Sequence, residues 1–187
     1  MSDREKIFHS IREALAPLPH RTEKPDWDDS LIVSRQSEDT GDRVSRFAAK
    51  LASASGKFFD EVNELGKYLV GEGSTFGYCD PELASIFRNI EGISLETDFD
   101  LSKIDDYSFG ITKAHAAIAE SGTIMLKDSE TSARLGALAP WIHIAVIRES
   151  DVVATIGEAI QRFGDDPSIV FATGPSKTAD VEGILIE

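Results

Sequence analysis

The feature that most constrains the fold is an alternation of short apolar runs with longer amphipathic stretches. The apolar runs are rich in β-branched and aromatic residues and occupy positions 75–79, 93–95, 141–147 and 169–171. Between most of them, apolar residues recur at the three- and four-residue spacing that helices show. Strands that alternate with helices favour a parallel sheet covered by helices. We therefore predict a layered α/β fold with a largely parallel sheet flanked by helices.

The amino-terminal region has a different texture. Ser2 and Glu5 fit a capping box at the start of a helix, whose apolar stripe consists of Ile7, Ile11 and Leu15. Residues 20–41 are polar and irregular, and Trp27 is the expected anchor of this linker. We predict an N-terminal helical arm and linker over residues 1–41 and an α/β domain over residues 42–187. The arm's stripe is expected to pack against another chain or loosely against the body.

Within the α/β domain, the periodic stretches predict several helices. They are expected over 42–55, over 60–71, after the Asp80-Pro81 start, within 128–139, and from Ser150 or Asp151 to Phe163. Leu135 and Leu138 are expected to point inward. Two apolar runs joined through Ser121 and Gly122 predict a hairpin, because glycine adopts the positive φ that such a turn needs. Small residues in this hairpin permit close approach by a ligand or by a neighbouring backbone.

Composition excludes several classes of function. The formal net charge is −14, which repels phosphate backbones and anionic membranes, so neither nucleic acid nor a membrane is an expected partner. Cys79 is the only cysteine, which excludes an internal disulfide and an iron–sulfur cluster held by this chain's own cysteines. No spacing of His, Asp and Glu suggests a metal site. No apolar run approaches the ~20 residues of a membrane span, so we expect a cytoplasmic protein.

The stretch 169–182 holds the most chemistry. Residues 169–171 are expected to form a strand buried on both faces of a parallel sheet, ended by a turn at Gly174. Ser176 or Thr178 would then cap a short helix, and Lys177 adds a positive charge. A helix start at the carboxyl edge of a sheet is a common place for an anionic ligand. The plain structural alternative is one more strand-to-helix connection.

Two motifs carry a resemblance to a known family. Residues 119–123 read Ala-Glu-Ser-Gly-Thr, and residues 173–182 read Thr-Gly-Pro-Ser-Lys-Thr-Ala-Asp-Val-Glu. With Gly-Ile-Thr at 110–112 and the strand around His143, they make residues 109–187 similar to the LUD-domain family, and within it to the lactate utilisation protein C group. Members of the family usually continue after Asp-Val-Glu into a Gly-Val-His-Gly-Pro motif, whereas this sequence ends at Glu187, so no role is assigned to that histidine.

The resemblance implies both a fold and a setting. The fold would be similar to that of the NagB/RpiA/CoA-transferase superfamily. The function would be that of a subunit in the oxidation of L-lactate to pyruvate, acting with iron–sulfur and cysteine-rich partner proteins that hold the clusters. The alternative is a stand-alone enzyme or sensor that binds a small phosphorylated or carboxylated metabolite at the Gly174 loop. Assembly into a homo-oligomer is a further option for partners. A purely structural adaptor is the third class.

The candidate site residues follow from the two motifs, whose loops are expected to face each other. Glu120 is the candidate acid/base or ligand-orienting carboxylate, with a solvated turn residue as the alternative. The ligand-binding candidates are Ser121, Gly122, Thr123, Gly174, Pro175, Ser176, Lys177, Thr178 and Asp180. His143 ranks second, because a lone histidine on a buried strand is more often a hydrogen-bonded core residue. His115 and His9 have no cluster around them in the sequence.

Overall fold

The computed structural model describes residues 2–16, 42–130, 134–164, 166, 168–175, 178–179 and 185–186. The chain divides into two compact units, residues 1–39 and 40–187. The expected domain boundary adjoins residue 41, which lies outside the described residues together with the linker and its Trp27, and it stays a prediction. Among the described residues, no helix is long and apolar enough to cross a membrane.

The described residues of the first unit, 2–16, form one helix, α1 (Asp3–Leu15). Its capping box is confirmed: the Glu5 amide donates to the Ser2 hydroxyl, and the Ser2 amide donates to the Glu5 carboxylate. Within this unit the expected apolar stripe of Ile7, Ile11 and Leu15 is exposed to solvent. What covers the stripe stays a prediction.

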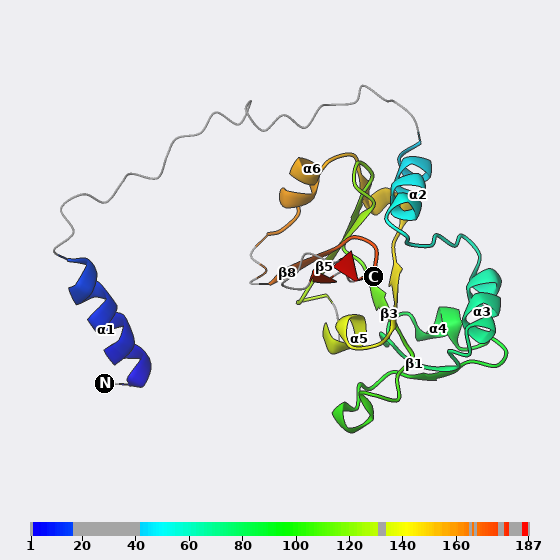
Figure 1. The fold of residues 1–187 in the computed structure, drawn as a ribbon, viewed down its shortest axis with the longest axis horizontal. Coiled ribbons are helices and arrows are strands. Elements are labelled where there is room, and N and C mark those ends of the chain that lie inside the picture. The colour runs from blue at the N-terminus through cyan, green and yellow to red at the C-terminus, as the bar shows by residue number, and fades with distance from the viewer. Residues whose placement is uncertain are drawn as a thin grey trace. The chain divides into compact units, whose positions relative to one another are not determined.

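The second unit begins with two helices that agree with the sequence pattern (Figure 1). Helix α2 (Arg43–Ser53) starts at Asp42, whose carboxylate accepts from the amides of Val44 and Ser45. Helix α3 (Val62–Gly71) buries Leu65 and Leu69. Both helices are confirmed to within a few residues, because a strong apolar period and a clear cap or stop mark each one.

A four-stranded parallel sheet is the first of the two larger sheets that follow. Its strands are β1 (Phe76–Cys79), β2 (Ser94–Glu96), β3 (Phe109–Lys113) and β6 (Ile142–Val146), in the order β2-β1-β3-β6. One face, with Cys79, Phe109 and Ile111, packs against α3 and α4 (Ala84–Phe87). The opposite face packs against α5 (Arg134–Leu138), because Gly136 approaches both Tyr78 and Gly110. A parallel sheet flanked by helices confirms the predicted α/β class.

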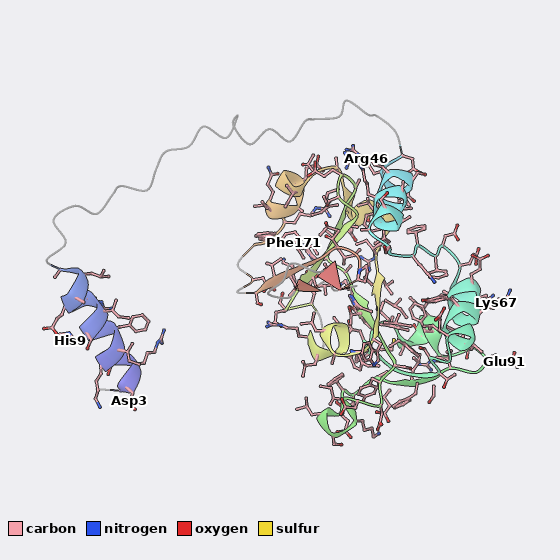
Figure 2. The ribbon with its side chains drawn as sticks, in the orientation of Figure 1. Asp3, His9, Arg46, Lys67, Glu91 and Phe171 are labelled. Carbon is pink, nitrogen blue, oxygen red and sulfur yellow. The ribbon has the colours of Figure 1, made fainter. Side chains whose placement is uncertain are left out.

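The second sheet is mixed rather than parallel. Its strands are β7 (Val152–Val153), β4 (Ala116–Ile118), β5 (Thr123–Lys127) and β8 (Ile169–Ala172), in the order β7-β4-β5-β8. The predicted hairpin is confirmed as the antiparallel pair β4–β5, with Gly122 at φ 70°. The strand predicted at residues 169–171 is present as β8, but its predicted place, buried on both faces of a parallel sheet, was wrong. It is an antiparallel edge strand beside β5, and Phe171 is 39% exposed on it (Figure 2).

Two predicted helices differ from the structure. The stretch after Asp151 is not one long helix: η3 (Glu149–Asp151) leads into β7, and α6 (Ile156–Ile160) starts at the Thr155 cap. Val152 instead pairs with Ala117 in the mixed sheet. Leu135 and Leu138 of α5 do not point inward, since 40% and 55% of their surfaces are exposed. The small residues of α5 are the buried ones, because they allow the helix to approach the sheet closely.

One of the apolar clusters lies beneath α2, and Ala145 of β6 packs against it together with residues of the mixed sheet. Phe47 from α2 packs in a buried cluster with Ala114, Ala117 and Ile124, so the helix covers the β4–β5 hairpin. A small antiparallel pair, β9 (Thr178–Ala179) and β10 (Leu185–Ile186), completes the described elements. Among the described residues of the connection after β8, Thr178 and Ala179 form a strand, so the helix predicted to begin at Ser176 or Thr178 does not include them. The pairing of 178–179 with the β-favouring Leu-Ile pair accounts for the difference.

Candidate functional site

The two sequence motifs face each other, as expected. Thr123 begins β5 and Thr173 follows β8, and the pairing of Ile124 with Ala172 brings them together. The Thr123 hydroxyl lies 2.6 Å from the Thr173 hydroxyl and 2.7 Å from that of Ser121. We call Ser121, Thr123 and Thr173 the hydroxyl line. Thr123 is buried at its centre, while Ser121 and Thr173 are exposed.

The glycines beside the hydroxyl line are explained by a neighbouring backbone. Gly122 has φ 70° and Gly174 has φ 65°, so each adopts a conformation that favours glycine. A Cβ atom at Gly122 would overlap the backbone of Leu51 in α2. A Cβ atom at Gly174 would overlap the carbonyl of Ala54, just after the same helix. Of the two interpretations of small residues here, close approach of a backbone is the one that the structure contains.

The carboxylate of Glu120 makes its hydrogen bond away from the hydroxyl line. Its Oε1 accepts from the Ile156 amide at 2.6 Å, at the first residue of α6. The side chain therefore satisfies a free amide at the start of that short helix, and it is not merely a solvated turn residue. Its part in any chemistry stays a prediction.

The structure describes only some of the remaining residues of the second motif. Pro175 follows Gly174 and is exposed. Ser176, Lys177 and Asp180 lie outside the described residues. Thr178 lies in β9 and not at a helix start, so the dipole argument for an anion at this turn no longer holds. What the structure retains of the expected site is the set of loops around the hydroxyl line.

The carboxyl edge of the parallel sheet carries further polar side chains. Asp80 is fully buried and accepts from the Tyr78 hydroxyl at 2.9 Å and the Lys113 amide at 3.0 Å. The sequence had predicted it as a helix cap, but α4 begins only at Ala84 and the carboxylate instead joins β1 to β3. Its acceptor oxygens are thus occupied within the fold.

His143 lies on the face opposite Ile142 and Ile144, as expected from strand alternation. Its Nε2 is 2.8 Å from the hydroxyl of Thr112, a residue of the neighbouring strand. Desolvation by burial lowers the pKa of His143 to about 4, so the imidazole is neutral at pH 7. These features agree with a hydrogen-bonded core histidine.

A second polar group gathers at the other end of β5, and the sequence analysis missed it. Lys113 ends β3, Lys127 ends β5, and both ammonium groups approach Glu130 in the turn that follows β5. His115 Nδ1 lies 2.7 Å from Glu130 Oε1. We call Lys113, His115, Lys127 and Glu130 the lysine–histidine cluster. The expectation that His115 has no cluster around it was wrong.

Electrostatics keep Glu130 charged. Partial burial acts to raise the pKa of its carboxyl, but the His115 bond and the charges of Lys113 and Lys127 outweigh it and lower the pKa below its usual value. An ionised Glu130 accepts a hydrogen bond from the N–H at Nδ1 of His115, and this bond fixes the orientation of the imidazole. A carboxylate that orients a histidine beside two ammonium groups is an arrangement suited to acid/base or anion-binding chemistry. Among the described residues, no group of three or more His, Cys, Asp or Glu side chains is arranged to hold a metal ion.

Comparison with known proteins adds the following matches. A family model described as the LUD domain matches residues 86–187. A lactate utilization protein C of Oceanobacillus iheyensis is 35% identical over 85 residues, which cover 41% of this chain and 36% of the relative. A protein of the same name from Bacillus licheniformis is 31% identical over 97 residues, which cover 48% of this chain and 40% of the relative.

One solved structure, a crystal structure of a DUF162 family protein from Deinococcus radiodurans, aligns with a TM-score of 0.42 at 17% identity. The alignment covers 71% of this chain and 89% of that one. The match to each of the two curated relatives spans less than half of the relative's length.

Proposed function

This chain belongs to the LUD domain family, and from that premise we propose that it is a cytoplasmic subunit supporting oxidation of L-lactate to pyruvate together with iron–sulfur partner proteins. The observation that carries the proposal is the match over residues 86–187, within a group of relatives that are named lactate utilization protein C. The single cysteine supports a division of labour in which the partners hold the clusters, because such clusters normally take four thiolates.

The genetic test is growth on L-lactate. Deleting the gene in its native host should abolish growth on L-lactate and leave growth on glucose unchanged, and re-expression of the chain should restore it. Unimpaired growth of the deletion strain on L-lactate would overturn the proposed role.

The biochemical test separates a subunit from a stand-alone enzyme. A tagged copy should co-purify with iron–sulfur proteins from lactate-grown cells, identified by mass spectrometry and iron content. The isolated chain should be colourless and should not oxidise L-lactate with a dye as electron acceptor. Turnover of L-lactate by the isolated chain would favour the stand-alone enzyme instead.

The runner-up function, a stand-alone enzyme or sensor for a small carboxylated or phosphorylated metabolite, is favoured by one observation. The hydroxyl line presents Ser121 and Thr173 at the surface, and hydroxyl groups both donate to and accept from oxyanions. Calorimetric titration of the isolated chain with lactate, pyruvate, phosphate and CoA compounds distinguishes it. Binding that Thr173→Val weakens would support this function, and no binding would remove it.

A further inference from the structure

We propose that the lysine–histidine cluster is a binding site for a small carboxylate, held between the ammonium groups of Lys113 and Lys127. The cluster lies at the opposite end of β5 from the hydroxyl line, so it is separate from the motif loops. The proposal does not depend on the proposed function, because any small monocarboxylate would satisfy it.

The first argument is that the two ammonium groups are close to carboxylates without being hydrogen-bonded to them. Lys127 Nζ lies 4.0 Å from Glu130 Oε1, and its side chain is only 13% exposed. Lys113 Nζ lies 3.8 Å from Glu130 Oε2 and 3.6 Å from Glu82 Oε1. Hydrogen bonds to oxygen need about 2.7–3.2 Å. Within the described part of the chain, neither ammonium group donates a hydrogen bond, although each carries three donors.

A mostly buried charge without a hydrogen-bonded acceptor is costly, so such groups normally have one. Glu130 does not supply it in this structure, because its oxygens stay 3.8 Å and 4.0 Å from the two ammonium groups while Oε1 accepts from His115. An acceptor placed between the lysines would satisfy both ammonium groups and leave the His115–Glu130 pair intact.

The imidazole contributes the third donor. With Nδ1 bonded to Glu130, the other ring nitrogen of His115 has no hydrogen-bond partner among the residues that the structure describes. When protonated, that nitrogen donates a charge-assisted hydrogen bond to an anion. Two ammonium groups and one imidazolium match the acceptor oxygens of a carboxylate.

The charge balance favours a monoanion over phosphate. Lys113 and Lys127 carry two positive charges, while Glu130 and Glu82 carry two negative ones. Asp166 near Lys127 adds a third negative charge, so the surroundings hold no positive surplus. A monocarboxylate adds one negative charge beside these carboxylates and a phosphate dianion adds two, so repulsion disfavours phosphate more.

The test is a titration of the purified full-length chain with acetate and, separately, with inorganic phosphate. The side-chain nitrogen signals of His115 are followed by NMR at one fixed pH. We expect a saturable acetate shift at His115, and weaker binding of phosphate. No saturable acetate shift, or tighter binding of phosphate than of acetate, would overturn the proposal.

Variants locate the site. Lys127→Met keeps the length of the side chain and removes its charge, and should weaken acetate binding about tenfold or more. Lys113→Met should do the same, and it serves as a second variant if Lys127→Met fails to fold. The control is Lys67→Met, on the exposed surface of α3 (Figure 2), which should bind like the wild type. Acetate binding unchanged in a folded Lys127→Met or Lys113→Met protein would identify the cluster as an internal ion-pair network only.

Discussion

The two ends of β5 differ in whether their polar groups have partners within the fold. At the Thr123 end, three hydroxyl groups bond to one another and the neighbouring glycines contact α2. At the Lys127 end, two ammonium groups stay 3.6–4.0 Å from the nearest carboxylates. At the first end the hydroxyls are hydrogen-bonded to one another, whereas at the second end the ammonium groups make no hydrogen bond to a described residue and keep their donors for a ligand.

The comparison teaches that a conspicuous motif and an available site need not coincide. Gly122 and Gly174 stand out in the sequence because their positions require glycine for packing and for positive φ. The lysine–histidine cluster has no such signature. Substitutions at the Thr123 end should therefore mainly reduce stability, and substitutions at the Lys127 end should mainly reduce binding.

The largest effect is expected for Gly122→Ala. A Cβ atom there meets the α2 backbone at positive φ, so strain and overpacking together should lower the free energy of unfolding by about 2–5 kcal/mol. The control is Gly73→Ala, at φ 74° with no atom within 4 Å of the added Cβ, which should lose only about 1–2 kcal/mol. Urea denaturation measures both. Equal losses would show that close approach to α2 is unimportant.

His143 lies outside both ends of β5 and serves as a reference for a desolvated polar group that has a hydrogen-bond partner, the hydroxyl of Thr112. Burial lowers its pKa from the usual 6.5 to about 4, so the unfolded chain binds more protons than the folded one between these values. The associated stability is complete above pH 6.5 and is lost as pH falls toward 4. The loss should be on the order of 3 kcal/mol.

Urea denaturation across this pH window tests the His143 prediction. His143→Gln should flatten the dependence of the unfolding free energy on pH. His9→Gln, on the exposed surface of α1, is the matched control and should leave the dependence unchanged. An equally steep loss of stability in His143→Gln would assign the acid sensitivity to other groups.

Thr123→Val tests the hydroxyl line itself. The change keeps the shape of the buried side chain and removes the central hydroxyl, so we expect a loss of about 1–2 kcal/mol. Thr173→Val should lose less, because water reaches that exposed side chain. Thermal denaturation of both single variants and the double variant measures the coupling. Strictly additive losses would mean that the two hydroxyls do not interact.

The smallest effect on stability is expected for Lys127→Met. Its ammonium group is mostly buried and makes no hydrogen bond to the described residues, and Glu130 keeps its bond to His115, so removing the charge should not lower the free energy of unfolding. Thermal denaturation without acetate measures this. A loss as large as that of Gly122→Ala would remove the distinction between the two ends of β5.

Sequence patterns predicted the parts of the fold in which local signals agree. Helix α3 combines an apolar period with a glycine stop, β6 is a long β-favouring run, and the β4–β5 hairpin has a glycine at its turn. In the stretch that contains β7 and α6, the local helical pattern conflicted with strand pairing. Val152 fits the helical spacing of Ile156 and Ile160, yet it pairs in a sheet, a contact that is not local. In α5, burial of Gly136 against Tyr78 overrode the apolar character of the leucines.

The candidate site was predictable only in part. We could predict that the two motif loops face each other from the hairpin and from the resemblance of both segments to one family. The lysine–histidine cluster was not predictable, because Lys113, His115 and Glu130 meet only once β3, the hairpin and the turn after β5 are all in place. Neither the charges of these residues nor their spacing along the chain indicates that they lie together in the fold.

The sheet order also sets the sequence in which parts of the chain should fold. Strands β3 and β6 are neighbours, and Thr112 reaches His143 across 31 positions, with the whole β4–β5 hairpin in between. Closing that long connection costs more chain entropy than closing the hairpin turn. The hairpin should therefore form early, and β6 should join the parallel sheet late. In pulse-labelling hydrogen exchange, amides of β4 and β5 should gain protection before those of β6.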